Sequence, residues 1–441
     1  MPALNRIINK FKTDSFIRQL KNSIWMMLEY LLRIFAAIFV SIYIARYLGP
    51  EEFGIVSYAI AIFTLFLSIT RLGMDSVLVR DLAKYSSQES AYKGTAFFMM
   101  LVASVIAYLL IYMFIDLIEK DNVANVYILI VSFGLLFQSI YVVEYSYQAK
   151  TKSKISSLVR MIVLGIGSIV KLYIVYINAE LVFFAYAYLF DFFMLFILFL
   201  FVHFLTKQIR FSFDKNLIKP LLQSGWPIMV TSLIGVLYTR IDQYMIKHLL
   251  SNYDLGMYVS ATKIYEGWSL VPNVVTLSLL PFLTKLHTQN NELYKKVFTI
   301  ILSCVFWIGI ILSIVSFVYS REIIDITFGD AFIDASDAFS IIMFTAPLVA
   351  ISSVAFRYLT IENLEKTIVY KLLITLGINV LLNFVLIPFY GIEGAAFATL
   401  IAMLISNYFI FYFDKRFKDF LIICNDAIKL NFVRRWKNNK T

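Results

Sequence analysis

Charge is scarce in this sequence, because only 15% of its 441 residues are Asp, Glu, Lys or Arg. Soluble proteins carry about 25% charged residues, so these side chains are too few to cover a water-soluble surface. Intrinsic disorder is excluded for the same reason, since disordered chains are polar and strongly charged. The composition therefore indicates a chain that folds in a lipid bilayer.

Cysteine and histidine are also rare, which excludes several kinds of site. Cys304 and Cys424 lie far apart, so they predict neither a disulfide framework nor a CxxC motif. The histidines are isolated and have no ligand partner at metal spacing, so we expect no metal site. They are His203, His248 and His287. No P-loop occurs, and we expect no cofactor.

Hydrophobic residues supply 60% of the sequence and aromatic residues 17%. They form long runs, and a transmembrane helix needs about 20 mostly apolar residues. Such runs predict twelve spans: 24–46, 53–74, 95–118, 124–148, 156–177, 181–203, 224–247, 255–281, 297–319, 338–358, 368–388 and 392–413. We therefore expect an all-α, polytopic membrane protein.

The net charge of +10 does not indicate a nucleic-acid partner, because the positive residues do not gather on one face. They lie in short clusters between the apolar runs. When residues at span edges are counted with the adjoining segments, 31 of the 39 Lys and Arg residues belong to one side, four belong to the other side and four lie deep within spans. Positive residues concentrate on the cytoplasmic side of membrane proteins. Both termini are therefore predicted to be cytoplasmic.

Two segments repeat in a way that predicts two halves. LGPEEFGIVSYA (48–59) matches LSNYDLGMYVSA (250–261) in its Leu, acidic, Gly and Ala positions, and NAELVFFAYA (178–187) echoes GIEGAAFATL (391–400). Parallel repeats of this kind are typical of transporters. We expect six-helix halves at 1–206 and 224–413, a cytoplasmic linker at 207–223 and a basic cytoplasmic tail at 414–441. The tail either lies on the membrane surface as an amphipathic helix or is solvated.

Ionisable side chains inside the spans are the candidate functional residues. Each costs about 2.5–3.5 kcal/mol to insert at mid-depth, so it needs a partner or a wet cavity. Arg33 lies four residues after Glu29, which predicts an ion pair, and Arg33 is also a candidate substrate-binding group. Lys171 either binds substrate or extends its amine to the membrane surface. Glu144 and Asp191 stand alone as acids within spans, and either is a candidate coupling group.

The seventh and eighth spans hold the densest group of charges. Asp242 and Lys263 lie at similar depths on consecutive antiparallel spans, so they are expected to pair. Glu266 shares a helix face with Lys263. Arg240 and Lys263 are candidates for substrate binding, and Asp242 and Glu266 for ion pairing or ion coupling. The alternative is a purely structural network.

Six segments carry a resemblance to a known family. They are ARYLGPEEFGIVSYA (45–59), LGMDSVLVRDLAK (72–84), SGWPIMVTSLIGVLYTRIDQYMI (224–246), LGMYVSATKIYEGWSLVPNVV (255–275), FGDAFIDA (328–335) and LIPFYGIEGAAFATLIA (386–402). In order and spacing, the chain resembles polysaccharide exporters of the multidrug/oligosaccharidyl-lipid/polysaccharide superfamily. It is most similar to Wzx-type flippases of O-antigen or capsule repeat units.

This resemblance implies a function without catalytic residues, since no bond is made or broken. It implies movement of an undecaprenyl-pyrophosphate-linked oligosaccharide across the bacterial inner membrane. The implied partners are this lipid-linked substrate, membrane lipids and the polysaccharide polymerase machinery.

Two alternatives remain at this point. One is a polytopic glycosyltransferase or polymerase that uses the same lipid-linked sugar. Its catalytic groups would have to come from short outer loops, in which an acidic stretch stands out: Asp325, Asp330, Asp334 and Asp337. The other alternative is a small-molecule antiporter of the same superfamily.

Overall fold

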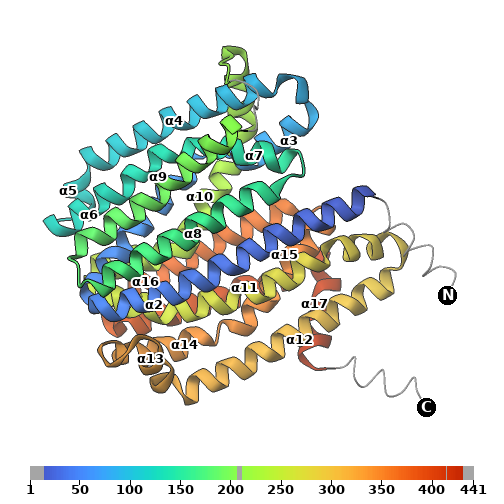
Figure 1. Cartoon of the computed structure of the whole chain (residues 1–441). Coiled ribbons are helices and arrows are strands. Elements are labelled where there is room, and N and C mark those ends of the chain that lie inside the picture. The colour runs from blue at the N-terminus through green and yellow to red at the C-terminus, as the bar shows by residue number, and fades with distance from the viewer. Residues whose placement is uncertain (1–13, 206–210, 414, 431–441) are drawn as a thin grey trace. The chain divides into compact units, whose positions relative to one another are not determined.

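The computed structural model describes residues 14–205, 211–413 and 415–430, which form helices and no strand (Figure 1). The predicted all-α fold is therefore confirmed. The α-helices are α2 (Asp14–Thr70), α3 (Met74–Lys84), α4 (Glu89–Met113), α5 (Ile115–Ile118), α6 (Asn122–Phe133), α7 (Tyr141–Ala149), α8 (Ser153–Tyr176), α9 (Leu181–Leu205), α10 (Ile218–Leu249), α11 (Asn252–Gln289), α12 (Asn291–Val318), α13 (Ser320–Phe328), α14 (Ser336–Met343), α15 (Ala346–Ile361), α16 (Glu365–Asn407) and α17 (Lys418–Ile428).

Eight helices within the described ranges are long and apolar enough to cross a membrane, or ten if two bent helix pairs each count as one span. Two of the long helices, α2 and α16, are interrupted by glycines with non-helical backbone angles. Gly49 has φ 70° and Gly391 has φ 57°, which glycine adopts without the penalty of a Cβ atom. Both breaks lie where the sequence separates two predicted spans. The count of twelve spans and the cytoplasmic termini stay predictions.

Several predicted spans are broken rather than straight. The run at 124–148 consists of α6, a 3₁₀ segment at Gly134–Ile140 and α7. The run at 338–358 is divided between α14 and α15, which bend by 44° at their junction. Pro347 lies in the first turn of α15, where a proline costs no hydrogen bond but prevents the preceding helix from continuing straight through.

The predicted linker and tail differ from what the structure describes. The linker at 207–223 is shorter than predicted, because α10 begins at Ile218; residues 206–210 lie outside the described part. Within the tail, α17 buries Phe420, Ile423 and Cys424 among the side chains of the core. Ser303 on α12 donates a 2.7 Å hydrogen bond to the carbonyl of Ala427. The prediction of a surface helix or a solvated tail is therefore wrong for α17, and residues 431–441 lie outside the described part.

The described helices pack as two compact units. Unit 1 comprises residues 1–44 and 58–236, and unit 2 comprises residues 45–57 and 237–441. In unit 1, α8 packs against α9, and the core gathers around Met74, Met100 and Phe199. In unit 2, α12 packs against α15 and α17. The predicted halves, 1–206 and 224–413, stay a prediction.

The two repeated segments meet inside unit 2. A Cβ atom added to Gly54 would overlap the backbone carbonyl of Asn252, and one added to Gly256 would overlap that of Pro50. The contact is reciprocal. In the repeat, Gly54 aligns with Gly256 and Pro50 aligns with Asn252, so each glycine contacts the equivalent residue of the other segment. Glycine at both positions allows the two helix starts to approach to backbone contact.

Arg46 lies two residues before the first repeated segment and contacts the helix that leads into the family segment 328–335. Its guanidinium donates hydrogen bonds to the carbonyls of Thr327 (2.8 Å), Ile326 (2.5 Å) and Asp325 (3.2 Å) in the last turn of α13. The Asp325 carbonyl also accepts from the backbone N–H of Gly329, and a cation at the carbonyl end of a helix is stabilising. Gly329 then ends α13 with φ 88°.

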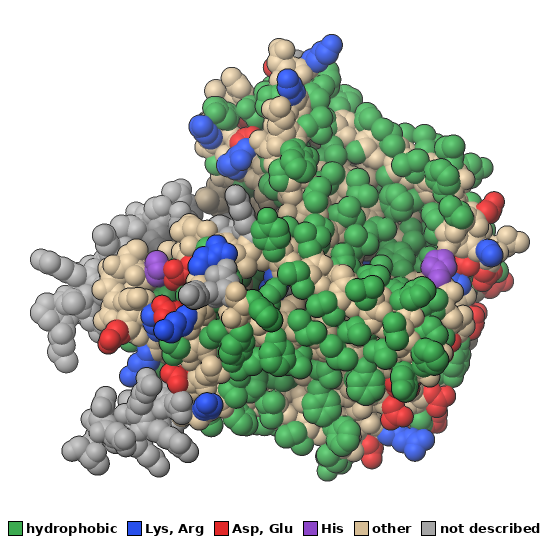
Figure 2. Space-filling view, turned by 180° about the vertical axis from the view of Figure 1, so that it is seen from behind, with side chains coloured by type: hydrophobic (Ala, Val, Ile, Leu, Met, Phe, Trp, Pro, Cys, Tyr) green, Lys and Arg blue, Asp and Glu red, His purple; other side chains and the backbone are tan. Residues whose placement is uncertain are grey.

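Hydrophobic side chains cover most of the surface visible in Figure 2, and charged groups gather toward its margins. Among the most exposed are Leu117 (81%), Tyr176 (81%) and Phe389 (80%). A soluble protein does not expose apolar surface on this scale. The surface is that of a multi-pass membrane protein in contact with lipid.

Candidate functional site

Unit 2 contains a cavity of about 300 Å³ that is lined in part by polar side chains. Helices α10, α11, α14, α15 and α16 line it. The lining side chains that bear on function are Tyr238, Asp242, Tyr258, Glu266, Ser352 and Thr399. Carboxylates, hydroxyls and amides among apolar spans are costly to bury unless they have partners or water. The cavity is therefore the candidate site in this unit.

Asp242 lies at one wall of this cavity and is 8% exposed. Its Oδ2 accepts hydrogen bonds from the hydroxyls of Tyr258 (2.6 Å) and Thr399 (3.1 Å). Behind it, Asn379 donates to Thr399 (3.1 Å), and Asn383 donates to Asn379 (2.9 Å). The other oxygen of Asp242, Oδ1, has no hydrogen-bond partner, and neither has Oδ1 of Asn383. The arrangement leaves acceptor oxygens free for a cation or a proton.

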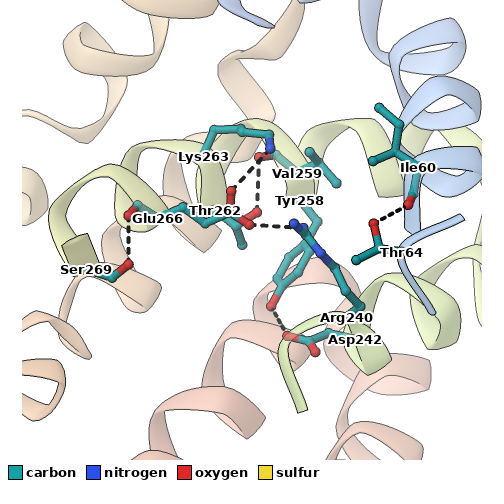
Figure 3. Close-up of polar contacts among 10 residues, drawn as sticks. All are labelled: Ile60, Thr64, Arg240, Asp242, Tyr258, Val259, Thr262, Lys263, Glu266 and Ser269. Carbon is teal, nitrogen blue, oxygen red and sulfur yellow. Dashed lines mark hydrogen bonds and ion pairs between the residues drawn. The ribbon is translucent and has the colours of Figure 1, made fainter. Parts of the chain in front are cut away.

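A second charged group joins α10 to α11. Glu266 pairs with Arg240 through a 3.0 Å contact and with Lys263 through a 3.2 Å contact, and all three side chains are partly exposed (Figure 3). Two cations thus share Glu266, and Arg240 also interacts electrostatically with Asp242. Such a group can bind an anion without first losing both of its internal contacts.

The predicted pair of Asp242 and Lys263 is wrong. Lys263 pairs with Glu266 one turn along the same helix, and Tyr258 donates to Asp242 instead (Figure 3). Thr399 also donates to Asp242. The i,i+3 pair needs no alignment between helices, whereas a pair across two helices depends on how each is rotated. The sequence fixes the spacing along a helix but not that rotation.

In unit 1, the predicted pair of Arg33 and Glu29 is confirmed, with a distance of 3.5 Å. Arg33 is 45% exposed and Glu29 only 6%, so the arginine presents its charge outward. The prediction that Glu144 stands alone is wrong. Arg160 forms an ion pair with it, and the Gln148 amide donates a 2.7 Å hydrogen bond to it. The buried carboxylate is neutralised by Arg160, which lies near the start of the predicted span 156–177.

These groups of unit 1 interact with one another. Arg160 interacts electrostatically with Glu29, Arg33 and Arg71. The Arg71 guanidinium lies 5.0 Å from the ring centroid of Tyr141, a cation–π contact. Arg71 also interacts electrostatically with Asp75, so three arginines and three carboxylates form a second cluster whose formal charges balance. Arg71 and Arg160 lie at the cytoplasmic edges of the predicted spans 53–74 and 156–177, so their contacts with other helices could not be predicted from the sequence.

Lys171 belongs to a separate contact in unit 1. It is 7% exposed, pairs with Asp191 on α9 and lies 4.6 Å from the ring centroid of Tyr188. The prediction that its amine reaches the membrane surface is wrong, and Asp191 is not a lone acid. The pair joins α8 to α9, which favours a structural role over substrate binding.

Within the described residues, no group of three or more His, Cys, Asp or Glu side chains could hold a metal ion. The residues that sequence reasoning missed are uncharged or were assigned to loops. Lys371, Thr375, Asn379 and Asn383 recur every four residues on α16 and are all buried. A polar residue every four positions in an apolar helix marks one helix face, and this pattern was the available signal.

Comparison with known proteins agrees with the geometry. The sequence profile of the polysaccharide biosynthesis protein family matches residues 19–287, and the MatE profile matches residues 227–385. The capsular polysaccharide biosynthesis protein CapF of Staphylococcus aureus is 24% identical over 90% of this chain and 99% of its own length. The probable low-salt glycan biosynthesis flippase Agl15 of Haloferax volcanii is 25% identical over 41% of this chain and 38% of its own.

Among solved structures, the lipid II flippase MurJ in an inward closed conformation has a TM-score of 0.73. The superposition covers 95% of this chain and 93% of that one, at 16% identity. At this level of identity, the similarity shows a shared fold.

Proposed function

Because this chain belongs to the polysaccharide biosynthesis protein family, we propose that it is a flippase for lipid-linked oligosaccharide. The substrate is an undecaprenyl-pyrophosphate-linked repeat unit of an O-antigen or capsule, which crosses the bacterial inner membrane by alternating access. The observation that carries the proposal is that arginine and lysine side chains gather in clusters within apolar helices. A pyrophosphate head group is the anion that such clusters suit.

Each cationic cluster has a side chain that can bind a phosphate oxygen. In unit 2, Arg240 and Lys263 both pair with Glu266, so one of them can turn to the pyrophosphate while the other keeps its ion pair. In unit 1, Arg33 is the exposed member of its cluster. Phosphate oxygens accept charge-assisted hydrogen bonds from arginine and lysine. The polyprenyl tail stays in lipid and needs no binding groups inside the protein.

Asp242 is the proposed coupling residue. Its unpartnered oxygen, with the free amide oxygen of Asn383 on the same hydrogen-bonded chain, offers a place for a proton or a small metal cation. Uptake of a cation would neutralise the buried carboxylate. An ion gradient could in this way bias one access state over the other.

Lys263 variants test the proposal in cells that depend on this chain for surface polysaccharide. We expect Lys263→Ala to abolish surface polysaccharide while the protein inserts at normal levels, since Glu266 then neutralises Arg240 completely. Lys263→Arg keeps the charge and should retain part of the activity. Exposed Lys152 provides the matched control, because Lys152→Ala removes a lysine outside the clusters. Normal surface polysaccharide in Lys263→Ala would contradict the binding role.

A small-molecule antiporter is the second candidate, because the MatE profile matches residues 227–385 and the cavity of about 300 Å³ is within the range of ligand pockets. The same strain separates the two functions. An antiporter predicts unchanged surface polysaccharide and an altered tolerance of toxic compounds.

A further inference from the structure

Lys371 is a buried cation that the charge clusters do not include. It lies at the cytoplasmic edge of the predicted span 368–388, and the structure places it in the second turn of α16, with 8% of the residue exposed. At 1.5 Å per residue, it lies about 9 Å along the helix from Glu365. A lysine at this depth is costly unless something compensates its charge.

No acidic side chain in the described part of the chain forms an ion pair with Lys371. Its Nζ makes one long hydrogen bond, 3.4 Å, to the hydroxyl of Ser352, and it lies 5.7 Å from the ring centroid of Phe411. Cys424 of α17 also interacts with it, but burial raises the pKa of this thiol, so Cys424 is neutral at pH 7. Within the described residues, no carboxylate therefore compensates a positive charge on Lys371.

Lys371 faces a cavity of about 90 Å³ in unit 2. Ser352, Thr375 and Asn407 also line it with polar groups. This volume is below that of pockets for drug-sized ligands, about 300–1,000 Å³, and suits a small anionic group. Tyr238, Ser352 and Phe356 line both this cavity and the larger one that contains Asp242, so the two spaces adjoin.

We propose that Lys371 and Ser352 form a binding site for a phosphate group. The proposal rests on the proposed function, because the phosphate that such a protein meets is the pyrophosphate of its lipid-linked substrate. A phospholipid head group carries the same chemistry and is the other source. If α16 begins on the cytoplasmic side, as the charge distribution predicts, the site receives the phosphate near its side of entry.

The test measures binding of geranyl pyrophosphate to the purified full chain in nanodiscs of neutral lipid. We expect Lys371→Met to weaken binding at least tenfold and to raise the Tm, because it removes an uncompensated buried charge. Lys371→Arg should bind with intermediate affinity. Lys152→Met, at an exposed lysine, is the matched control and should bind as the unaltered protein does.

Ser352→Asp separates loss of the site from loss of the fold. It places a carboxylate beside Lys371, so we expect higher thermal stability together with loss of geranyl pyrophosphate binding. A structural role for Lys371 predicts no change in binding for either variant, and that result would overturn the proposal. Binding that falls in nanodiscs containing phosphatidylglycerol assigns the site to lipid head groups, whereas unchanged binding assigns it to the substrate.

This measurement is independent of transport. Failure of the proposed flippase function would be seen as normal surface polysaccharide in cells that lack the chain, whatever the purified protein binds. Failure of the phosphate site would be seen as equal binding by Lys371→Met and the unaltered chain.

Discussion

At the scale of single residues, the side chains inside the spans fall into two classes. Some charges are neutralised within their unit, as Lys171 is by Asp191 and Glu144 is by Arg160. Others keep an unsatisfied group, as Asp242 does at Oδ1. The first class holds helices together, and the second is available to bind the substrate or a coupling ion.

Asp242 yields a prediction at this scale. Asp242→Asn keeps the volume and an oxygen that can accept from Tyr258 or Thr399, but it removes the charge that would bind a cation. We expect normal folding, at least tenfold less surface polysaccharide and no dependence of the remainder on the ion gradient. Tyr258→Phe, which keeps the charge and loses one hydrogen bond, should retain partial activity.

The double variant Asp242→Asn with Lys263→Gln should be no more active than either single variant, because these two side chains do not pair. Recovery of surface polysaccharide in the double variant would contradict the arrangement around Asp242. Surface polysaccharide and membrane insertion would be measured in the same cells.

At the scale of helices, the contact between the repeated segments depends on two glycines. Gly54→Ala places a methyl group against the backbone of Asn252, and overpacking of this kind costs about 1–3 kcal/mol. We expect a lower Tm for Gly54→Ala and for Gly256→Ala in the purified protein. Gly377→Ala on α16 is the matched control, since nothing lies within 4 Å of a Cβ atom there. Equal Tm values in Gly54→Ala and Gly377→Ala would contradict the backbone contact.

The docking of α17 is open to a chemical test. Cys424 is fully buried on this helix, and burial raises the pKa of its thiol. Since the thiolate is the reactive form, Cys424 should react with N-ethylmaleimide far more slowly at pH 7 than an exposed thiol does. Raising the pH toward the ordinary range of cysteine should not restore the rate in the folded protein.

The experiment uses a Cys304→Ser chain, in which Cys424 is the one remaining cysteine, and mass spectrometry of the labelled protein. The rate should rise to that of an exposed thiol in denaturant. Rapid labelling without denaturant would mean that α17 is not packed as described.

At the scale of the whole molecule, the direction of the chain in the membrane remains to be measured. Reporter fusions after Pro50, Asp254 and Asp330 should be periplasmic, and fusions after Gln88, Lys215 and Asn439 should be cytoplasmic. The reason is that Lys and Arg are concentrated in the segments that contain Gln88, Lys215 and Asn439, and such segments are retained on the cytoplasmic side. Opposite results at any two of these points would contradict the twelve-span topology.

The sequence predicts the features that depend on spacing along one helix or on bulk composition. The all-α membrane fold, the family and the local pairs Glu29–Arg33 and Lys263–Glu266 are confirmed. The contacts of Asp242, Lys171 and Lys371 could not be predicted, because they depend on how separate helices are rotated and on where a helix begins. A charge near a predicted span end can belong to a loop or to a buried turn.

The central claim is that the chain moves lipid-linked oligosaccharide across the membrane. The most direct measurement is the leaflet in which these molecules accumulate when the chain is deleted, with surface accessibility of the sugar to a periplasmic lectin as the readout. A flippase predicts accumulation on the cytoplasmic face and no lectin binding until the membrane is opened. Unpolymerised units on the periplasmic face of the deletion strain would contradict it and indicate a polymerase.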